Sequence, residues 1–492
     1  MRFTETAALA RALHFLAVPH ATWIMSSIRS PITAEKRHLH AAPAPNPDVD
    51  RQETDYLCAA ATDKHLRGQV LAALQDYQRV LQRDENHAPA LHGLGLACVQ
   101  LGRPVDAVSF LRRAAALAPE NAEFHNNLGM VLAERRQLKE AILCHQRAIG
   151  LQPAFAAAHH ALGNALRKSG QLEPAVRCFE RALALTPNLV AAHINLGTAY
   201  KDLNHWDAAL GAYQQALDIA PKNAPEYAIA QHNYGTALYQ LGRLEAAAAA
   251  LNRAVELNPD LPEAWVNLGN IARDQGRLDD ALAIFRKIHA AHPEYSPGLS
   301  NLLFTLNYVD GASQHEIVSL AREFNARHAA ALTRSAPTPK RRRDPNRRLR
   351  IAYVSPDLRS HACAFFVAPL FENHDAARFE VYAYAEIARP DATTARLQGQ
   401  VDGWRTTVGL DDAEVAEAIR ADEIDIVIDL AGHTANSRIL ALAHRPAPVQ
   451  ITYLGYPATT GLDAMDYRLT DAITEPLGTG DQYYTETLIR LP

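Results

Sequence analysis

Residues 126–153 read NNLGMVLAERRQLKEAILCHQRAIGLQP, and residues 160–187 read HALGNALRKSGQLEPAVRCFERALALTP. The two stretches are offset by 34 residues, and each has a Leu-Gly pair, an alanine 12 residues after the glycine and a closing proline. The same pattern recurs through the first half of the chain. Its glycines are Gly95, Gly129, Gly163, Gly197, Gly235 and Gly269, and its alanines are Ala107, Ala141, Ala175, Ala209, Ala247 and Ala281. A fixed period of this length indicates stacked repeats.

Each repeat is expected to be a pair of helices. Glycine and alanine have little bulk, so two helices can cross closely there, and proline ends the second helix because it cannot donate to the hydrogen-bond ladder. One such pair cannot bury its apolar face alone, so neighbouring pairs stack into a superhelix. The period and its signature residues match the tetratricopeptide repeat. We therefore predict about seven repeats over residues 51–299, the first marked by Ala73 without the glycine.

The length and composition limit the number of domains, the kinds of partner and the kinds of site that we expect. The chain has 492 residues, a formal net charge of −5 and five cysteines, with no C-x-x-C pair. This length predicts several domains. The near-neutral charge gives no reason to expect nucleic acid or a membrane surface as a partner. No run of 18 apolar residues indicates a membrane-spanning helix, and the cysteine spacing indicates no metal site.

The two ends of the repeat region are expected to be irregular. Residues 1–50 have no steady period and are predicted to be disordered. The apolar segment Ala10–Met25 is interrupted by polar residues and is a poor signal peptide, so we expect a cytoplasmic protein. Residues 300–345 are predicted to form a helical connector and a basic linker that contains Lys340–Arg343, with the next domain beginning near residue 346.

After this boundary the pattern changes to alternating strands and helices. The predicted strands are Leu349–Ser355, Phe379–Tyr384, Ile424–Leu430 and Val449–Leu454, and Asp412–Ala421 is a predicted helix. This order predicts a Rossmann-like parallel sheet, in which ligands bind beyond the carboxyl ends of the strands. The predicted fold is therefore an α-superhelix of tetratricopeptide repeats followed by an α/β Rossmann-like lobe.

Three long stretches of this second region carry a family resemblance. They are LRIAYVSPDLRSHACAFF from Leu349, DLAGHTANSR from Asp429 and HRPAPVQITYLGYPATTGLDAMDYRLTD from His444. Together with the repeats they resemble the protein O-GlcNAc transferase family, and most closely its SPINDLY-like branch, which includes protein O-fucosyltransferases.

The resemblance implies an inverting GT-B glycosyltransferase. It would move N-acetylglucosamine from UDP-GlcNAc to Ser or Thr of a protein held by the repeats, with no metal or other cofactor. Fucose from GDP-fucose is the alternative donor sugar. A GT-B enzyme has two Rossmann-like lobes, and residues 346–492 correspond to the amino-terminal one. The carboxyl-terminal lobe is therefore expected to be missing from this sequence, which keeps a catalytically inactive peptide-binding scaffold open as an alternative.

The resemblance also points to site residues. His361 corresponds to a histidine at the family's catalytic centre, where it would act as a general base or contact the donor phosphates; a turn histidine that caps the next helix is the alternative. Asp429 and His433 are further catalytic candidates, and for both a structural role stays open. The predicted donor-binding residues are Thr434, Gly455, Tyr456, Pro457 and Thr460.

A column of asparagines precedes the repeat glycines by two residues. Its members are Asn127, Asn195, Asn233 and Asn267, followed by Asn301 in the next half-repeat. The amide side chains could bind the backbone of an extended acceptor peptide without selecting its side chains. Alternatively, they only bond neighbouring repeats, and the sequence does not decide between the two.

Overall fold

The computed structural model describes residues 47–338, 344 and 347–492. The chain folds as two compact units that part between Ala220 and Pro221. The basic run Lys340–Arg343 and residues 1–46 of the segment expected to be disordered lie outside the described residues. Within that segment, residues 47–50 form the first turn of a helix, α2. Proline is favoured at the first helical position, which explains why the helix begins at Pro47.

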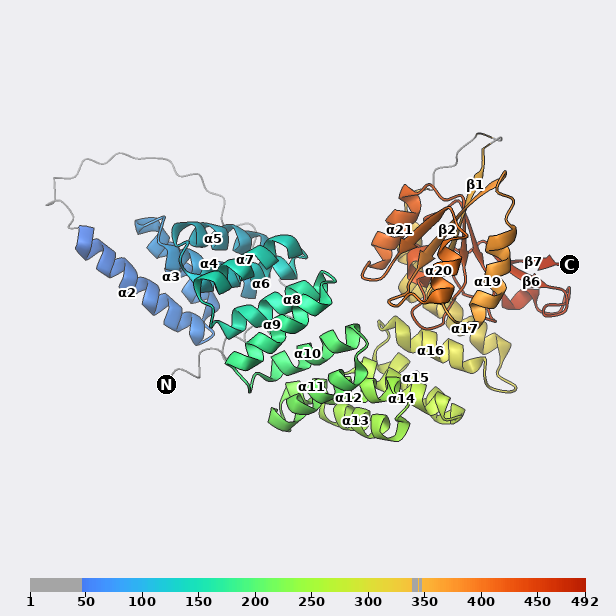
Figure 1. Ribbon diagram of the computed structural model, residues 1–492, viewed down its shortest axis with the longest axis horizontal. Coiled ribbons are helices and arrows are strands. Elements are labelled where there is room, and N and C mark those ends of the chain that lie inside the picture. The colour runs from blue at the N-terminus through green and yellow to red at the C-terminus, as the bar shows by residue number, and fades with distance from the viewer. Residues whose placement is uncertain (1–46, 339–343, 345–346) are drawn as a thin grey trace. The chain divides into compact units, whose positions relative to one another are not determined.

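The first unit consists of helix pairs (Figure 1). In chain order the helices are α2 (Pro47–Leu66), α3 (Val70–Arg83), α4 (Ala88–Gln100), α5 (Pro104–Leu117), α6 (Ala122–Glu134), α7 (Leu138–Leu151), α8 (Ala156–Lys168), α9 (Leu172–Leu185), α10 (Val190–Asp202) and α11 (Trp206–Ile219). Within this unit, α3, α5, α7 and α9 each pack against the helix before and the helix after, and α11 packs against α10, so the pairs stack as the repeat pattern predicts.

The signature residues lie where the helices of a pair cross. In the α8–α9 pair, a Cβ added to Gly163 would lie 2.6 Å from the Phe179 ring, and Ala175 is fully buried. Gly170 ends the turn region after α8 in a left-handed conformation, with φ of +80°. The repeat alanine is completely buried in all seven pairs: Ala73, Ala107, Ala141, Ala175, Ala209, Ala247 and Ala281.

The second unit opens with two more pairs and four shorter helical segments. The pairs are α12 (Pro225–Gln240) with α13 (Leu244–Leu257) and α14 (Pro262–Asp274) with α15 (Leu278–Ala291). They are followed by α16 (Ser296–Leu306), α17 (Gln314–Phe324), a π-helical segment η1 (Asn325–Ala329) and α18 (Ala330–Ser335). A single apolar core contains Phe285, Leu303 and Phe324 together with Tyr456 and Leu462 of the α/β region. The helical connector is therefore packed into the lobe.

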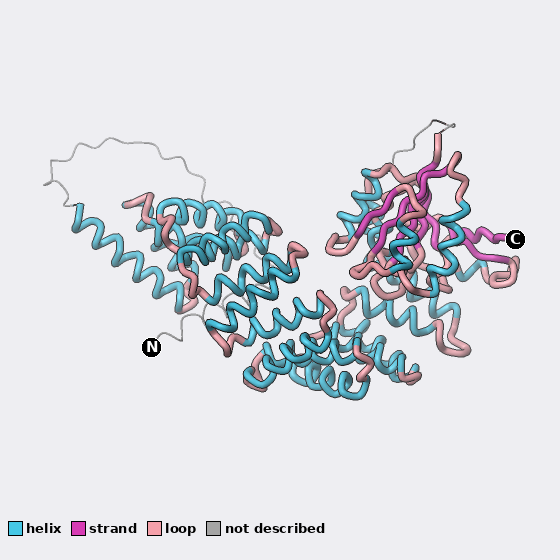
Figure 2. The backbone as a smooth tube through the Cα atoms, viewed as in Figure 1, coloured by secondary structure: helices cyan, strands magenta, loops and turns pink. Residues whose placement is uncertain are grey.

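The lobe is built on a parallel sheet of seven strands in the order β3-β2-β1-β4-β5-β6-β7. Figure 2 draws the strands in magenta. The strands are β1 (Leu349–Ser355), β2 (Phe379–Ala385), β3 (Gly403–Thr406), β4 (Ile426–Asp429), β5 (Val449–Thr452), β6 (Tyr467–Asp471) and β7 (Thr487–Leu491). The predicted bounds of β1 are correct. Those predicted for β4 and β5 are too long by three and two residues. The run chosen for β4 starts two residues before the strand and ends one residue after it, and the run chosen for β5 continues into the following loop. The strands β3, β6 and β7 were not predicted.

Helices cover both faces of the sheet. One core layer joins α19 (Ala362–Asn373) and α20 (Ala392–Gln398) to one face of β1 and β2. The other layer joins α21 (Asp412–Ala421) and α22 (Ile439–Ala443) to the opposite face, and a short 3-10 helix, η2 (Asp481–Tyr483), precedes β7. The predicted fold class of repeat helices followed by a Rossmann-like lobe is confirmed.

Among the residues that the structure describes, none of the helices combines the length with the apolar character that crossing a lipid bilayer requires.

Candidate active site at the carboxyl ends of the strands

The strand order marks where a ligand would bind. β1 pairs with β2 on one side and with β4 on the other, so the direction of winding reverses between β1 and β4. In open parallel sheets, ligands bind in the crevice at this switch point, beyond the carboxyl ends of the strands. The loop 356–361 follows β1 and the loop 430–438 follows β4, and these loops contain the candidate residues His361 and His433.

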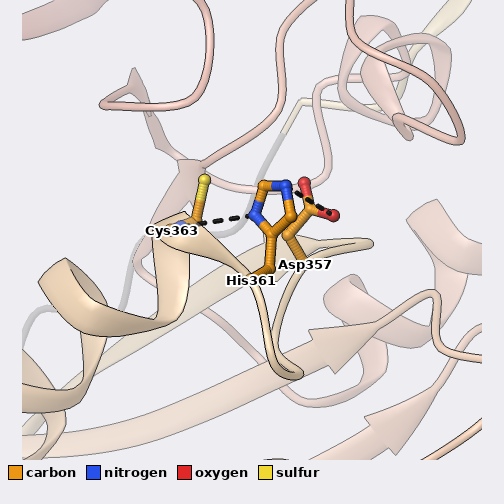
Figure 3. Close-up of side chains that lie close together, drawn as sticks. All are labelled: Asp357, His361 and Cys363. Carbon is orange, nitrogen blue, oxygen red and sulfur yellow. Dashed lines mark hydrogen bonds and ion pairs between the residues drawn. The ribbon is translucent and has the colours of Figure 1, made fainter.

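His361 is the N-cap residue of α19 and is exposed on its loop. Its Nδ1 accepts a hydrogen bond of 3.3 Å from the Cys363 backbone N–H, and its Nε2 lies 3.8 Å from Asp357 Oδ1 (Figure 3). Because Nδ1 accepts, the neutral ring carries its proton on Nε2. The capping role that the sequence left open is therefore present, and it leaves Nε2 accessible from solvent.

The loop of His361 is held by polar contacts on both sides. Asp357 donates its backbone N–H to Ser355 Oγ at 2.9 Å, and the Ser360 N–H donates to Asp391 Oδ2 at 2.7 Å. Burial raises the pKa of the Asp357 carboxyl, while the neighbouring His361 and Arg359 lower it. These contacts fix the position of His361 at the switch point.

Asp429 has a structural role. Its side chain is fully buried and accepts hydrogen bonds from the backbone N–H groups of Ala431 and Gly432 at 3.1 and 2.8 Å, and from Thr452 Oγ1 at 3.2 Å. Burial raises the pKa of Asp429 to about 6. Because the carboxyl is buried and bonds the backbone of the following residues, it shapes the loop after β4.

His433 also has a structural role. It is 2% exposed, its Nε2–H donates to the Thr460 carbonyl at 2.9 Å, and its Nδ1 accepts from Ser300 Oγ at 3.2 Å. Burial lowers the pKa of His433 to about 4, so the ring is neutral at pH 7. Both ring nitrogens are occupied, which leaves none for proton transfer. His433 instead ties α16 to the loops that follow β4 and β5.

Three predicted donor-binding residues join the loop after β5 to neighbouring segments. A Cβ added to Gly455 would lie 1.8 Å from the Leu430 carbonyl oxygen, so only glycine allows the two loops to approach. The buried Tyr456 hydroxyl accepts from Asn307 Nδ2 at 3.4 Å. The Thr460 backbone N–H donates to the buried Glu486 carboxylate at 2.7 Å.

The remaining two donor-binding candidates are more accessible. Pro457 is exposed and Thr434 is half-buried. The Thr434 hydroxyl oxygen is buried without a hydrogen-bond partner among the described residues. Of the eight residues predicted from the motifs, His361 and Pro457 are exposed, Thr434 and Gly455 are half-buried and the other four are buried. Their roles at the site stay predictions.

Sequence reasoning missed two residues beside His361. Asp357 and Cys363 place a carboxylate oxygen and a thiol sulfur close to the imidazole, with the donor atoms of the three residues all within 4.8 Å of one another. The signal was present as D-x-x-x-H-x-C within seven residues. The segment contains one histidine and one cysteine and no pair of either, so it does not match the usual spacing patterns of metal sites.

The asparagine column bonds neighbouring repeats in the first unit. Asn127 Nδ2 lies 2.9 Å from His92 Nε2, and Asn195 Nδ2 lies 2.8 Å from His160 Nε2. Burial lowers the pKa of both histidines to about 4, so each ring is neutral and accepts from the amide. The amide oxygens of Asn127 and Asn195 accept no hydrogen bond within the described part of the chain.

The second unit continues the column less regularly. Asn267 Nδ2 donates to Thr236 Oγ1 at 2.9 Å, one repeat earlier. Asn301 differs, because its Nδ2 donates to the Pro297 carbonyl of its own helix at 2.9 Å and its Oδ1 lies 3.5 Å from Arg273. Asn233 is half-buried on α12. The column thus bonds adjacent repeats through its N–H groups, while the free amide oxygens can still accept hydrogen bonds from a ligand.

Comparison with protein-family models adds independent information. Residues 312–492 match glycosyl transferase family 41. Residues 65–130 and 111–156 match tetratricopeptide repeat models, and residues 152–287 match the model of the cilia and flagella-associated protein 70 C-terminal domain.

Individual relatives agree with these matches. The chain is 38% identical over 196 residues to a protein of Petunia hybrida named probable UDP-N-acetylglucosamine–peptide N-acetylglucosaminyltransferase SPINDLY. This match covers 39% of this chain and 21% of that protein. It is 37% identical over 148 residues to the UDP-N-acetylglucosamine–peptide N-acetylglucosaminyltransferase of Caenorhabditis elegans, covering 30% of this chain and 13% of that one.

A solved structure shares part of the chain. A mutant O-GlcNAc transferase of Thermobaculum terrenum is 32% identical, with a TM-score of 0.46, and the match covers 69% of this chain and 57% of that one. The chain spans about a fifth of the length of the SPINDLY relatives that it matches. The family 41 match, the repeats and these relatives together support an O-GlcNAc transferase/SPINDLY-like family for this chain.

Proposed function

We propose that this chain is part of a protein O-glycosyltransferase that transfers N-acetylglucosamine from UDP-GlcNAc to Ser or Thr side chains. The observation that carries the proposal is the exposed His361, at the switch point of a lobe that matches glycosyl transferase family 41. In the reaction the acceptor oxygen attacks the anomeric carbon, and the bond from that carbon to the diphosphate breaks. The hydroxyl proton leaves through a water molecule.

The structure favours one of the two roles that the sequence allowed for His361. With Nδ1 accepting from the Cys363 N–H, the neutral ring offers an Nε2–H donor and no free lone pair. Such a donor stabilises the negative charge that develops on the leaving diphosphate, whereas a general base would need the opposite tautomer. We therefore assign His361 the role of a hydrogen-bond donor to an oxygen of the nucleotide sugar.

The repeats would hold the acceptor. An extended peptide presents backbone N–H groups, each of which needs an acceptor when it is buried. The amide oxygens of Asn127 and Asn195 are suited to this, since their N–H groups already bond His92 and His160. Replacing Asn127, Asn195, Asn233 and Asn267 together by Ala should weaken peptide binding measured by titration calorimetry. The matched control is Asn252→Ala, on the exposed side of α13.

The activity itself is best tested in a chimaera. Residues 347–492 form one Rossmann-like lobe, so the chain is fused to the part of the Arabidopsis thaliana SPINDLY relative that follows the matched segment. The fusion is incubated with a Ser/Thr-containing peptide and UDP-GlcNAc, and the peptide mass is measured. We expect a GlcNAc adduct. A folded fusion that binds the peptide but leaves its mass unchanged with UDP-GlcNAc and with GDP-fucose would contradict the proposal, whereas a fucose adduct alone would change only the donor.

A further inference from the structure

The cluster formed by Asp357, His361 and Cys363 contains three different kinds of metal ligand. One carboxylate oxygen, one imidazole nitrogen and one thiol sulfur lie within 4.8 Å of one another, all on the seven residues that connect β1 to the first turn of α19 (Figure 3). Nε2 of His361 lies 3.8 Å from Asp357 Oδ1. Zinc bonds of about 2.0–2.3 Å in a tetrahedron place neighbouring ligands roughly 3.3–3.7 Å apart. Small side-chain rotations would therefore bring the three atoms into coordination distance.

The chemical types of the three ligand atoms indicate which metal would bind. Thiolate and imidazole ligands favour Zn²⁺ over Mg²⁺ and Ca²⁺, which prefer oxygen. Three protein ligands with the fourth position open to water is the arrangement of accessible zinc sites, and closed structural sites use four. We propose that Asp357, His361 and Cys363 bind Zn²⁺, and that this metal inhibits the reaction at His361.

Binding would exchange contacts that the metal-free loop makes. Zn²⁺ bonds to His361 Nε2 and to Cys363 Sγ, and the thiol proton is released to solvent. The ring then carries its proton on Nδ1, so the 3.3 Å hydrogen bond from the Cys363 N–H opens. The start of α19 keeps the bond from the Ala364 N–H to the His361 carbonyl, at 3.0 Å. Arg359, which lies 3.8 Å from Asp357 Oδ1 and is exposed, can turn away to admit the cation.

The consequence for activity rests on the proposed function. Nε2–H is the group that we assign to the nucleotide sugar, and a metal on this nitrogen removes the donor. Zn²⁺ would therefore act as an inhibitor, in contrast to a required cofactor. The metal site itself stands on the geometry of the loop and can be tested without any transfer assay.

The test uses the full chain and Co²⁺, a spectroscopic substitute for Zn²⁺. A Co²⁺–thiolate bond gives an intense charge-transfer band, which distinguishes this site from adventitious binding by other histidines. We expect the band to saturate at one equivalent and to disappear on addition of Zn²⁺. Cys363→Ala should abolish the band, and Asp357→Asn should weaken binding by at least about tenfold. Cys178→Ala, which removes another half-buried thiol, is the matched control and should leave the band unchanged.

Each result decides the proposal. No band at one equivalent, or a band that survives in Cys363→Ala, would overturn it. Cys363→Ser keeps the size of the side chain and replaces Cys363→Ala if that variant does not fold. In the transfer assay of the fusion, the ratio of rates with and without Zn²⁺ is compared within each variant. If the Co²⁺ band appears but Zn²⁺ does not inhibit transfer, the metal site stands and the role assigned to His361 is refuted. The two proposals can therefore fail separately.

Discussion

The polar contacts inside the repeats and those inside the lobe differ in how far apart their partners lie in the sequence. In the first unit the bonds Asn127–His92 and Asn195–His160 each join residues 35 positions apart, one repeat and one residue. In the second unit Ser300–His433 spans 133 residues and Asn307–Tyr456 spans 149. Contacts between repeats can therefore be predicted from the sequence period. Contacts in the lobe cannot, because their partners lie far apart and share no sequence pattern.

The largest effect is expected where two loops of the lobe meet. Gly455→Ala would place a methyl group 1.8 Å from the Leu430 carbonyl oxygen, so the loops after β4 and β5 must separate. We expect destabilisation by more than about 4 kcal/mol, seen as loss of hydrogen-exchange protection in β4 and β5. The control is Gly399→Ala, where the nearest atom is 3.5 Å from the new Cβ and φ is −72°. Retained protection in Gly455→Ala would show that the loops are not in contact.

His433→Ala should have the next largest effect. It removes a buried ring and leaves the Thr460 carbonyl and Ser300 hydroxyl without their partner. We expect a loss of about 3 kcal/mol in the free energy of local opening, measured by hydrogen exchange in residues 430–462. Ser300→Ala removes only one of the hydrogen bonds and should cost about 1 kcal/mol. An equal cost for both variants would mean that the ring does not join the three segments.

The repeat core should respond to overpacking. Ala175 is fully buried where α9 crosses its partner, and Ala175→Leu is expected to cost on the order of 1–3 kcal/mol. Ala184→Leu changes an exposed position of the same helix and is the control. Hydrogen exchange of α8 and α9 measures both. If the two variants show the same free energy of local opening in α8 and α9, the phase that we assign to the repeat is wrong.

The smallest effect concerns a histidine in an apolar repeat position. His145 occupies the place of Phe179 and Phe285, it is fully buried, and its Nδ1 bonds only Asn126. Burial lowers the pKa of His145 to about 4. A lowered pKa stabilises the folded state above the unfolded value near 6.5, and this stability is lost as the pH falls from 6.5 toward 4.

His145→Phe should therefore reduce the acid sensitivity of the first unit. The difference between its melting temperatures at pH 7 and pH 5 is expected to shrink by about 3 °C, or on the order of 1 kcal/mol. Loss of the bond to Asn126 lowers both melting temperatures alike and cancels in this difference. His125→Phe is the control, because this half-buried ring bonds the Pro119 carbonyl at 3.1 Å. An unchanged pH dependence would assign the acid sensitivity to other groups.

The same contrast explains how much could be predicted from the sequence. The close approach of Gly163 to Phe179 follows from a pattern that recurs every 34 residues. The predicted helix Asp412–Ala421 has the observed bounds because Asp411 and Glu414 form a capping box at its start. The strand β3 could not be predicted, since GWRT is short and has no alternation of buried and exposed residues.

The site was predictable only in part. The motif resemblance placed His361 correctly at the end of the loop after β1. It could not show that both ring nitrogens of His433 form hydrogen bonds with Ser300 and Thr460, because those partners lie 133 and 27 residues away. A family motif marks residues that matter for the site without separating those that touch the ligand from those that hold its loops.

The most direct test of the account is the catalytic rate of the fusion with two substitutions of His361. At saturating UDP-GlcNAc and peptide, His361→Ala should lower kcat by roughly 100-fold or more, as expected for the loss of one donor to a developing negative charge. His361→Gln keeps an N–H donor near the position of Nε2 and should recover at least about tenfold over His361→Ala. Equal rates for the two variants, or a kcat close to that of the unsubstituted fusion in His361→Ala, would contradict the assignment of His361 as a donor to the nucleotide sugar.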